Sequence, residues 1–255
     1  MDIPGIPPLH YFTITSEGHE PAYHSWRTGT AIKRFTNAFV FDPTENKVRA
    51  LMLIQLHFTA HPALLQVLLG LKKRGFGKGI YNGFGGKVDP GESVGDAALR
   101  ELQEESHLTA PLEPCGLLLF VGAGHGHSHH ITVFRAQTWQ GEPTETDEMR
   151  PEWFAYPSLD VPSTSLPSDA LPSFPYDDMW KDDPLWVSHL LTSKYFVGRV
   201  DYGPVPIPEP GQTVEPVVDG TGYLVDGKRV EAGMQKWVVG TMEKEEWERT
   251  RIWEI

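Results

Sequence analysis

Residues 85–108, GGKVDPGESVGDAALRELQEESHL, carry the most informative pattern in the chain. Two glycines and an Asp-Pro-Gly turn come first, and no glycine or proline follows Gly95. Ser93 stands where an N-cap residue is favoured, so the pattern predicts a helix over residues 93–106. The glycines before it predict a loop that approaches another group closely.

Three glutamates of this predicted helix share its apolar side. At 3.6 residues per turn they fall within an arc of about 100°; they are Glu101, Glu104 and Glu105. The same side carries Val94, Ala97, Ala98 and Leu102. A solvated charged face, the usual role of a charge run, would lie opposite the apolar stripe. The arrangement therefore favours carboxylates directed at the protein body, which is costly unless a cation such as Mg²⁺ pairs with them.

Composition and charge exclude several classes of protein. The 255 residues carry a formal net charge of −12, so the basic surface of a nucleic-acid polymer binder is absent. The single cysteine, Cys115, excludes an intramolecular disulfide and fits a reducing compartment. No apolar run approaches the ~18 residues of a membrane span. We expect a cytoplasmic monomer with no membrane partner, and a nuclear or mitochondrial location stays open.

The remainder predicts one α/β domain with extensions. Strands are expected at 35–41, 67–70, 116–122 and 129–135, and Asp183-Pro184 opens a second helix. We expect an N-terminal extension at 1–34, a domain at 35–203 and a C-terminal extension at 204–255. Two segments interrupt the domain, 49–66 and a Pro/Ser-rich stretch at 157–175. Removing 49–66 leaves a normal hairpin, so this segment is either a retained short intron or a genuine insertion.

The glutamate spacing resembles the signature of the Nudix hydrolase family, Gly-x5-Glu-x7-Arg-Glu-apolar-x-Glu-Glu-x-Gly-apolar. The matching residues are Gly86, Glu92, Arg100, Glu101, Leu102, Glu104, Glu105 and Leu108. His107 replaces the last glycine, which puts the turn after the helix in doubt but removes no metal ligand.

Further blocks are similar to the Nudix hydrolases of oxidised purine nucleoside triphosphates. They read LLGLKKRGFGKG, YNGFGGKV, ETDEMRPEWF and YDDMWKDDPLW, followed by YFVG. The resemblance implies a Nudix fold, a mixed sheet between helices. It also implies Mg²⁺-dependent hydrolysis, with Mn²⁺ as a possible substitute, of 8-oxo-dGTP and 2-hydroxy-dATP to the monophosphate and pyrophosphate. Such an enzyme would sanitise the nucleotide pool.

The same resemblance implies the roles of individual residues. The expected metal ligands are Gly85, through its carbonyl, and Glu101, Glu104, Glu105 and Glu148. Arg100 is expected to orient the glutamates, although a plain helix salt bridge is the alternative. The expected substrate-binding residues are Thr36, Lys72, Asn82, Phe84, Gly85, Gly86, Lys87, Phe120, Trp180, Lys181, Asp182 and Asp183, with Phe76 and Tyr202 in or near the pocket.

Within that set, a few residues carry the expected base recognition. Asn82 offers a donor and an acceptor to a base edge, and Trp180 offers a stacking surface. One of Asp182 and Asp183 is expected to hold a proton, because adjacent carboxylates repel; the alternative is that Asp183 only caps the second helix.

Some features and functions remain open. The loop histidines His125, His127, His129 and His130 are expected to be exposed rather than to bind metal, and Trp237, Trp247 and Trp253 to be packing anchors. Another Nudix substrate, such as a nucleotide sugar, and a non-catalytic nucleotide sensor are the alternative functions.

Overall fold

The computed structural model describes residues 3–28, 31–42, 65–123, 126–156, 171–191, 194–212, 214–216, 222–225 and 228–254. Most of the 49–66 segment and residues 157–170 of the second insertion lie outside the described residues, as does His125. The choice between a retained intron and a genuine insertion therefore falls outside them as well.

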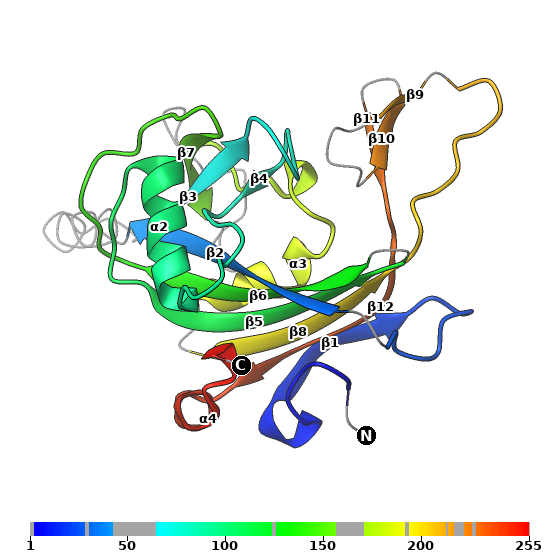
Figure 1. Cartoon of the computed structure of the whole chain (residues 1–255), viewed down its shortest axis with the longest axis horizontal. Helices are drawn as coiled ribbons and strands as arrows, with labels where there is room; N and C mark the ends of the chain where they lie inside the picture. The colour runs from blue at the N-terminus through cyan, green and yellow to red at the C-terminus, as the bar shows by residue number, and fades with distance from the viewer. Residues whose placement is uncertain are drawn as a thin grey trace, which may run out of the picture.

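A nine-stranded mixed sheet organises the chain (Figure 1). Its order is β1-β12-β8-β5-β6-β2-β3-β4, and β7 pairs with β3. The pairs β2·β6 and β5·β8 are parallel, and the others are antiparallel. The strands are β1 Thr13–His19, β2 Ala31–Asp42, β3 Leu65–Lys72, β4 Tyr81–Asn82, β5 Glu113–Gly122, β6 His127–Ala136, β7 Met149–Tyr156, β8 Tyr195–Tyr202 and β12 Met234–Met242. All four strands predicted from the sequence are present, each longer than expected.

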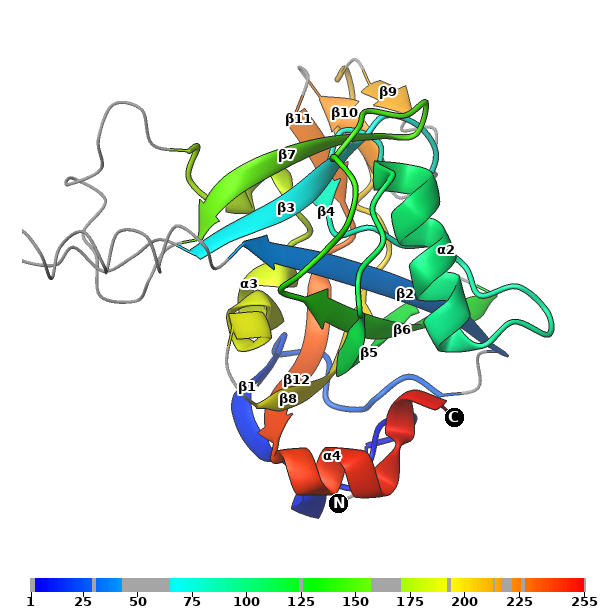
Figure 2. The same ribbon diagram turned by 90° about the vertical axis from the view of Figure 1, so that its left-hand side faces the viewer.

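Strand β2 joins two parts of this sheet. It pairs with β6 over Ala31–Val40 and with β3 only from Val40 to Asp42. Its side chains alternate between two faces, as a strand requires. Phe39 and Phe41 enter the core cluster that contains Trp186, whereas Ala38 packs with the apolar side of the helix predicted over residues 93–106. β2 therefore has a helix above each of its faces (Figure 2).

Helix α2, Val94–Ser106, is the helix predicted over residues 93–106. Ser93 caps it by accepting a hydrogen bond from the Asp96 N–H. The predicted apolar stripe, Val94, Ala97, Ala98 and Leu102, is buried. His107 ends the helix in the left-handed conformation, with φ of 63°, so the family's usual glycine is replaced in the very backbone state that favours glycine.

The other helices are short. Helix α3, Asp183–Trp186, continues into the 3₁₀ helix η4, Val187–Leu191, as the sequence predicted for this stretch. Helix α4, Lys244–Thr250, lies on the opposite side of the sheet from α3 (Figures 1 and 2). Three further 3₁₀ turns are η1 Leu9–Tyr11, η3 Tyr176–Asp178 and η5 Ile252–Glu254. No helix in the described part of the chain is long and apolar enough to cross a membrane.

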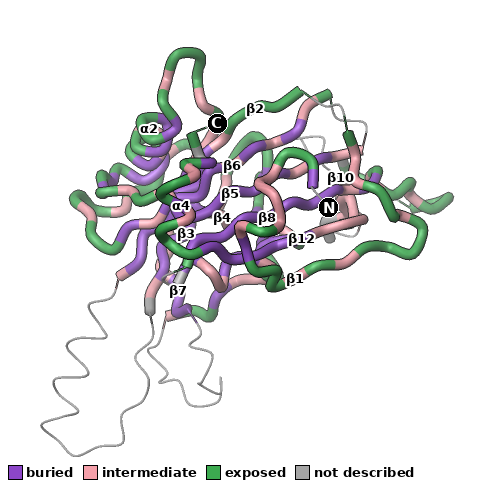
Figure 3. Tube along the Cα trace, turned by 90° about the horizontal axis from the view of Figure 1, so that it is seen from below, coloured by how far each residue is buried: buried purple, intermediate pink, exposed green. Residues whose placement is uncertain are grey.

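The two expected extensions are integrated into the fold. Strand β1 pairs with β12, and β12 pairs with β8, so each extension adds a strand to one edge of the central sheet. Residues 31–34 belong to β2, inside the sheet. A separate small sheet, β9 Val214–Pro216, β10 Gly222–Val225 and β11 Lys228–Glu231, precedes β12. Buried residues are concentrated in β2, β3, β5, β6, β8 and β12 and on the inner side of α2 (Figure 3).

The left-handed residue at the end of α2 generates a stability prediction. A non-glycine residue in this conformation costs about 1 kcal/mol. We expect His107→Gly to raise the free energy of unfolding by roughly that amount in urea denaturation. The control is Gln103→Gly, at an exposed position inside the same helix, which should lower it by about 1 kcal/mol. A destabilised His107→Gly protein would contradict this account.

Candidate functional site

A cavity of about 470 Å³ opens between β2, β4, β5, β6 and α3. Most residues predicted to bind substrate line it, although they come from distant parts of the sequence. These are Thr36, Lys72, Asn82, Gly85, Gly86, Phe120, Trp180, Lys181, Asp182 and Asp183, together with Phe76, Glu148 and Tyr202.

Two predicted substrate-binding residues, Phe84 and Lys87, do not line the cavity. Phe84 is fully buried and packs with Leu102 in a core cluster behind it. Lys87 contributes its backbone carbonyl, which accepts a hydrogen bond from Arg100. Both residues belong to a segment that bridges to β2, so their neighbours Gly85 and Gly86 face the cavity instead.

Gly85 and Gly86 lie too close to their neighbours for any side chain. A Cβ atom on Gly85 would be 2.0 Å from the Thr36 carbonyl oxygen, and one on Gly86 would be 2.4 Å from Glu101 Oε1. The Gly85 N–H donates to Glu105 Oε2 at 2.9 Å. The glycines therefore allow the loop to approach the glutamates of the signature directly, as the sequence predicted. We call these three residues, Glu101, Glu104 and Glu105, the box glutamates.

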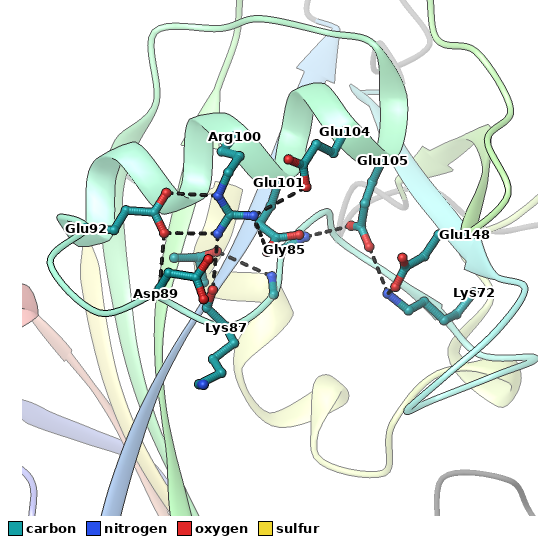
Figure 4. Close-up of polar contacts among 12 residues, drawn as sticks. Lys72, Gly85, Lys87, Asp89, Glu92, Arg100, Glu101, Glu104, Glu105 and Glu148 are labelled. Carbon is teal, nitrogen blue, oxygen red and sulfur yellow. Dashed lines mark hydrogen bonds and ion pairs between the residues drawn. The ribbon is translucent and has the colours of Figure 1, made fainter.

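Arg100 gathers three carboxylates beside α2 (Figure 4). Its guanidinium makes a two-pronged contact with Glu92, at 2.9 and 3.0 Å. The Nη1 atom contacts Glu101 at 2.8 Å and Glu104 at 3.3 Å. The hydrogen bonds that Arg100 donates to Glu92 and then to Glu101 raise the pKa of Arg100. One arginine thus fixes three glutamates, which goes beyond a single helix salt bridge.

Lys72 pairs with the two carboxylates that Arg100 does not contact, Glu105 and Glu148. Its Nζ lies 2.8 Å from Glu105 Oε1 and 2.7 Å from Glu148 Oε1. Burial raises the pKa of Glu105, and this effect outweighs the opposing Lys72 charge. Burial also acts to raise the pKa of Glu148, but there the contacts with Lys72 and Arg74 prevail and the net pKa is lowered. Glu148 therefore reaches the box glutamates from a loop, as expected, through a shared lysine.

The three box glutamates differ in exposure. The Glu105 side chain is 4% exposed and Glu101 15%, whereas Glu104 is 61% exposed. Only two of the three predicted inward carboxylates thus face the protein body. In the described part of the chain, no three Asp, Glu, His or Cys side chains converge closely enough to hold a metal ion. Lys72 and Arg100 instead supply the positive charge between the carboxylates.

Asp182 and Asp183 are buried in the cavity wall, with exposed fractions of 3% and 1%. Asp182 accepts hydrogen bonds from Trp186 Nε1 at 2.9 Å and from the Tyr202 hydroxyl at 2.5 Å. Asp183 accepts one from the Trp180 backbone N–H at 3.0 Å. Neither carboxylate caps α3, which corrects the alternative reading of Asp183. Burial, followed by the Asp182 charge, raises the pKa of Asp183 well above its ordinary value.

Aromatic rings cover another part of the cavity. Phe76 stacks on Trp180 with 5.2 Å between centroids, and His129 lies 5.9 Å from Phe76. His129 lines the cavity and His130 is buried, so these two loop histidines are not the exposed residues that we expected. Burial lowers the pKa of His130 to about 4. The alternation of β6 explains the error, because it turns part of the histidine run inward.

The cavity also contains residues that the sequence did not reveal. Asn37 lies in its wall beside Asn82, and Val205, Glu231 and Ala232 close it from the segment before β12. A signal for Asn37 exists, because it is the one polar residue in the aromatic alternation Phe35, Asn37, Phe39, Phe41. No comparable sequence signal marks Glu231 as a cavity residue.

The fold and this box define the class of protein. The NUDIX domain model matches residues 58–197, more than half of the chain. The chain belongs to the Nudix family and has the Nudix fold.

Individual relatives agree with this assignment. The oxidized purine nucleoside triphosphate hydrolase of Danio rerio is 44% identical over 134 residues, covering 52% of this chain and 76% of the relative. The protein of the same name from Mus musculus is 41% identical over 138 residues, covering 54% and 79%. Among solved structures, a MutT protein from Bacillus halodurans is 22% identical, with a TM-score of 0.45, covering 68% of this chain and 91% of that one.

The raised pKa of Asp183 generates a prediction on stability. Because its pKa is raised, Asp183 keeps its proton in the folded protein up to a higher pH than in the unfolded chain, where an Asp side chain titrates near pH 4. Above that pH the folded state binds more protons than the unfolded state, so this group's contribution to stability falls as pH rises towards the folded-state pKa. Asp183→Asn cannot ionise. We therefore expect its free energy of unfolding, relative to the original protein, to rise by roughly 1 kcal/mol or more between pH 5 and pH 7.5.

Urea denaturation at the two pH values measures this difference. Asp177→Asn, which alters an exposed acid on η3, serves as the matched control and should show no such rise. Parallel pH profiles for Asp183→Asn and the control would contradict a protonated Asp183.

Proposed function

We propose that the protein hydrolyses oxidised purine nucleoside triphosphates to the monophosphate and pyrophosphate, and so removes them from the nucleotide pool. One observation carries the proposal. The network of Arg100, Lys72 and the glutamates lies directly beside a cavity walled by Trp180 and the Asp182–Asp183 pair. A site for phosphate chemistry and a site for a purine are thus contiguous. The printed names of the two animal relatives support the same substrate class.

Nudix hydrolases generally use divalent metal ions, and this donor set fits one. All of its side-chain donors are carboxylate oxygens, which Mg²⁺ prefers and Mn²⁺ also accepts. The Lys72 ammonium between Glu105 and Glu148 marks a position where the protein favours a cation. We infer that Glu101, Glu104, Glu105 and Glu148, with the Gly85 carbonyl, would hold the ion after turning from Lys72 and Arg100, which pair with these carboxylates in this structure. Once bound, it neutralises phosphate charge and makes a water molecule more acidic.

The chain's own residues have distinct tasks in this mechanism. Lys72, which pairs with Glu105 and Glu148 in this structure, would leave the two carboxylates to a bound cation and would pair through its ammonium with the substrate phosphates. Arg100 keeps Glu101 in place through their 2.8 Å contact. A box glutamate or Glu148 removes the proton from the attacking water. The pKa of Glu105 is raised by burial, which makes this carboxylate a better proton acceptor.

Base recognition takes place at the other end of the cavity. Trp180 provides a stacking face for the purine. A protonated Asp183 donates a hydrogen bond, whereas Asp182 is held by Trp186 and Tyr202 and accepts. Such a pair suits a base that offers both donors and acceptors, which 8-oxoguanine and 2-hydroxyadenine do.

The wider setting of the proposal follows from the composition. We propose that residues 35–203 form the Nudix domain, with 1–34 and 204–255 supplying β1 and β12 to its sheet. Cys115 is free and buried, which suits a reducing compartment such as the cytoplasm. We propose a monomer that acts on a small-molecule nucleotide.

A turnover screen tests the substrate class. The original protein with Mg²⁺ is assayed for pyrophosphate release from 8-oxo-dGTP, 2-hydroxy-dATP, dGTP, dATP and dinucleoside polyphosphates. We expect the two oxidised purines to have the highest kcat/KM. Faster turnover of another nucleoside diphosphate derivative would establish the alternative Nudix activity, and no turnover of any member would contradict the proposed hydrolysis and favour the nucleotide sensor.

Substitution of Glu105 tests the catalytic assignment. Glu105→Gln removes the charge of the most buried glutamate while retaining its shape, so we expect kcat to fall about 100-fold or more, because an amide is a poor metal ligand. The control is Glu142→Gln, at an exposed acid outside the box, which should retain full activity. Thermal unfolding of both variants shows that they fold. Unchanged turnover in Glu105→Gln would refute the assignment.

A further inference from the structure

Asn37 is a buried polar residue in the wall of the purine cavity. It lies on β2 in a face otherwise made of Phe35, Phe39 and Phe41, and it is 7% exposed. The cavity is lined by both Asn37 and Asn82, the asparagine already expected to contact the base. A polar side chain in an aromatic face is costly unless it has a task.

The hydrogen bonds of these two amides determine their orientation. The Gly83 backbone N–H donates to Asn82 Oδ1 at 2.9 Å. A backbone N–H can only donate, so the Asn82 atom that faces it must be the oxygen. The same oxygen accepts a second hydrogen bond, from Asn37 Nδ2 at 2.8 Å. Both of its lone pairs are then used.

The remaining oxygen of the pair is also withheld from the cavity. Asn37 Oδ1 is buried and has no hydrogen-bond partner. It lies against Gly83, where a Cβ atom would be only 2.2 Å away. An amide nitrogen carries two N–H bonds, so each of the two residues still has an N–H to donate. This corrects the expectation that Asn82 offers a base both a donor and an acceptor.

We propose that Asn37 is a specificity-determining residue: by occupying the second lone pair of Asn82 Oδ1, it makes this wall of the cavity present N–H donors only, so that the site selects purines with a carbonyl oxygen at that edge. The proposal rests on the proposed function. A 6-oxo purine such as 8-oxoguanine supplies the acceptor. The keto form of 2-hydroxyadenine supplies it through its 2-oxo group.

The same wall disfavours an amino group. An exocyclic amino group at the position of the carbonyl would place N–H opposite N–H, leaving donors on both sides unpaired in a buried site. Unpaired polar groups of this kind are the strongest source of discrimination between similar substrates. The structure thus distinguishes 8-oxo-dGTP from 8-oxo-dATP, which carries an amino group at C6 and no second carbonyl on that edge.

The experiment compares these two nucleotides in the original protein and in variants of Asn37. Asn37→Leu retains the branched shape of the side chain and removes the hydrogen bond to Asn82, so that one lone pair of Asn82 Oδ1 becomes available to accept from a substrate amino group. We expect the ratio of kcat/KM for 8-oxo-dGTP over 8-oxo-dATP to fall about tenfold. The change should appear in KM, with kcat for 8-oxo-dGTP within about twofold of the original value, because the side-chain hydrogen bond of Asn37 goes to Asn82 and not to a glutamate.

Two further variants separate specificity from stability. Asn37→Asp differs from the original by one group and cannot donate to Asn82, so it should lower the ratio as well, and it tests the proposal even if the leucine variant fails to fold. Ile131→Val trims the wall of the same cavity without altering a polar atom. This variant should change kcat/KM for the two nucleotides by the same factor, so that the ratio of the two kcat/KM values stays the same.

The outcomes distinguish this inference from the proposed function. If the original protein hydrolyses neither oxidised purine, the proposed function and this inference both fail. If it hydrolyses 8-oxo-dGTP but does not prefer it over 8-oxo-dATP, only the inference is overturned. The inference is also overturned if the ratio survives in folded Asn37→Leu or Asn37→Asp.

Discussion

The buried charge of Glu105 is the constraint on which the rest of the site depends. A carboxylate with a 4% exposed side chain requires compensation. It receives a backbone N–H from Gly85 and the ammonium of Lys72. These partners come from the glycine loop and from β3, so a single charge connects α2 to both. The glycines, the lysine and the helix register are therefore parts of one electrostatic solution.

This constraint explains why the centre of the molecule could be predicted from sequence. The period of α2 placed its apolar stripe and its inward glutamates on the same side, and the glycines implied a close approach. These are local properties, readable over about three turns of helix. The resemblance then assigned Lys72, Trp180 and the Asp182–Asp183 pair, and the structure brings them to one cavity.

What could not be predicted depends on non-local pairing. The separation of Phe84 from the cavity depends on the bridge to β2. The inward turn of His130 depends on the register of β6 against β5. The pairing of β1 with β12 joins residues more than 200 positions apart, and no periodicity within either segment specifies its partner.

That last pairing has a consequence for the edge of the sheet. Without β1, the long strand β12 would present its backbone N–H and C=O groups as a template for another chain. β1 covers them and becomes the edge itself, but a less adhesive one. It is seven residues long, has a register irregularity between Ile14 and Ser16, and carries Glu17 and Gly18. A short, charged edge strand with an irregular register discourages intermolecular strand addition. The N-terminal segment thereby protects an acidic enzyme with a wide sheet against aggregation.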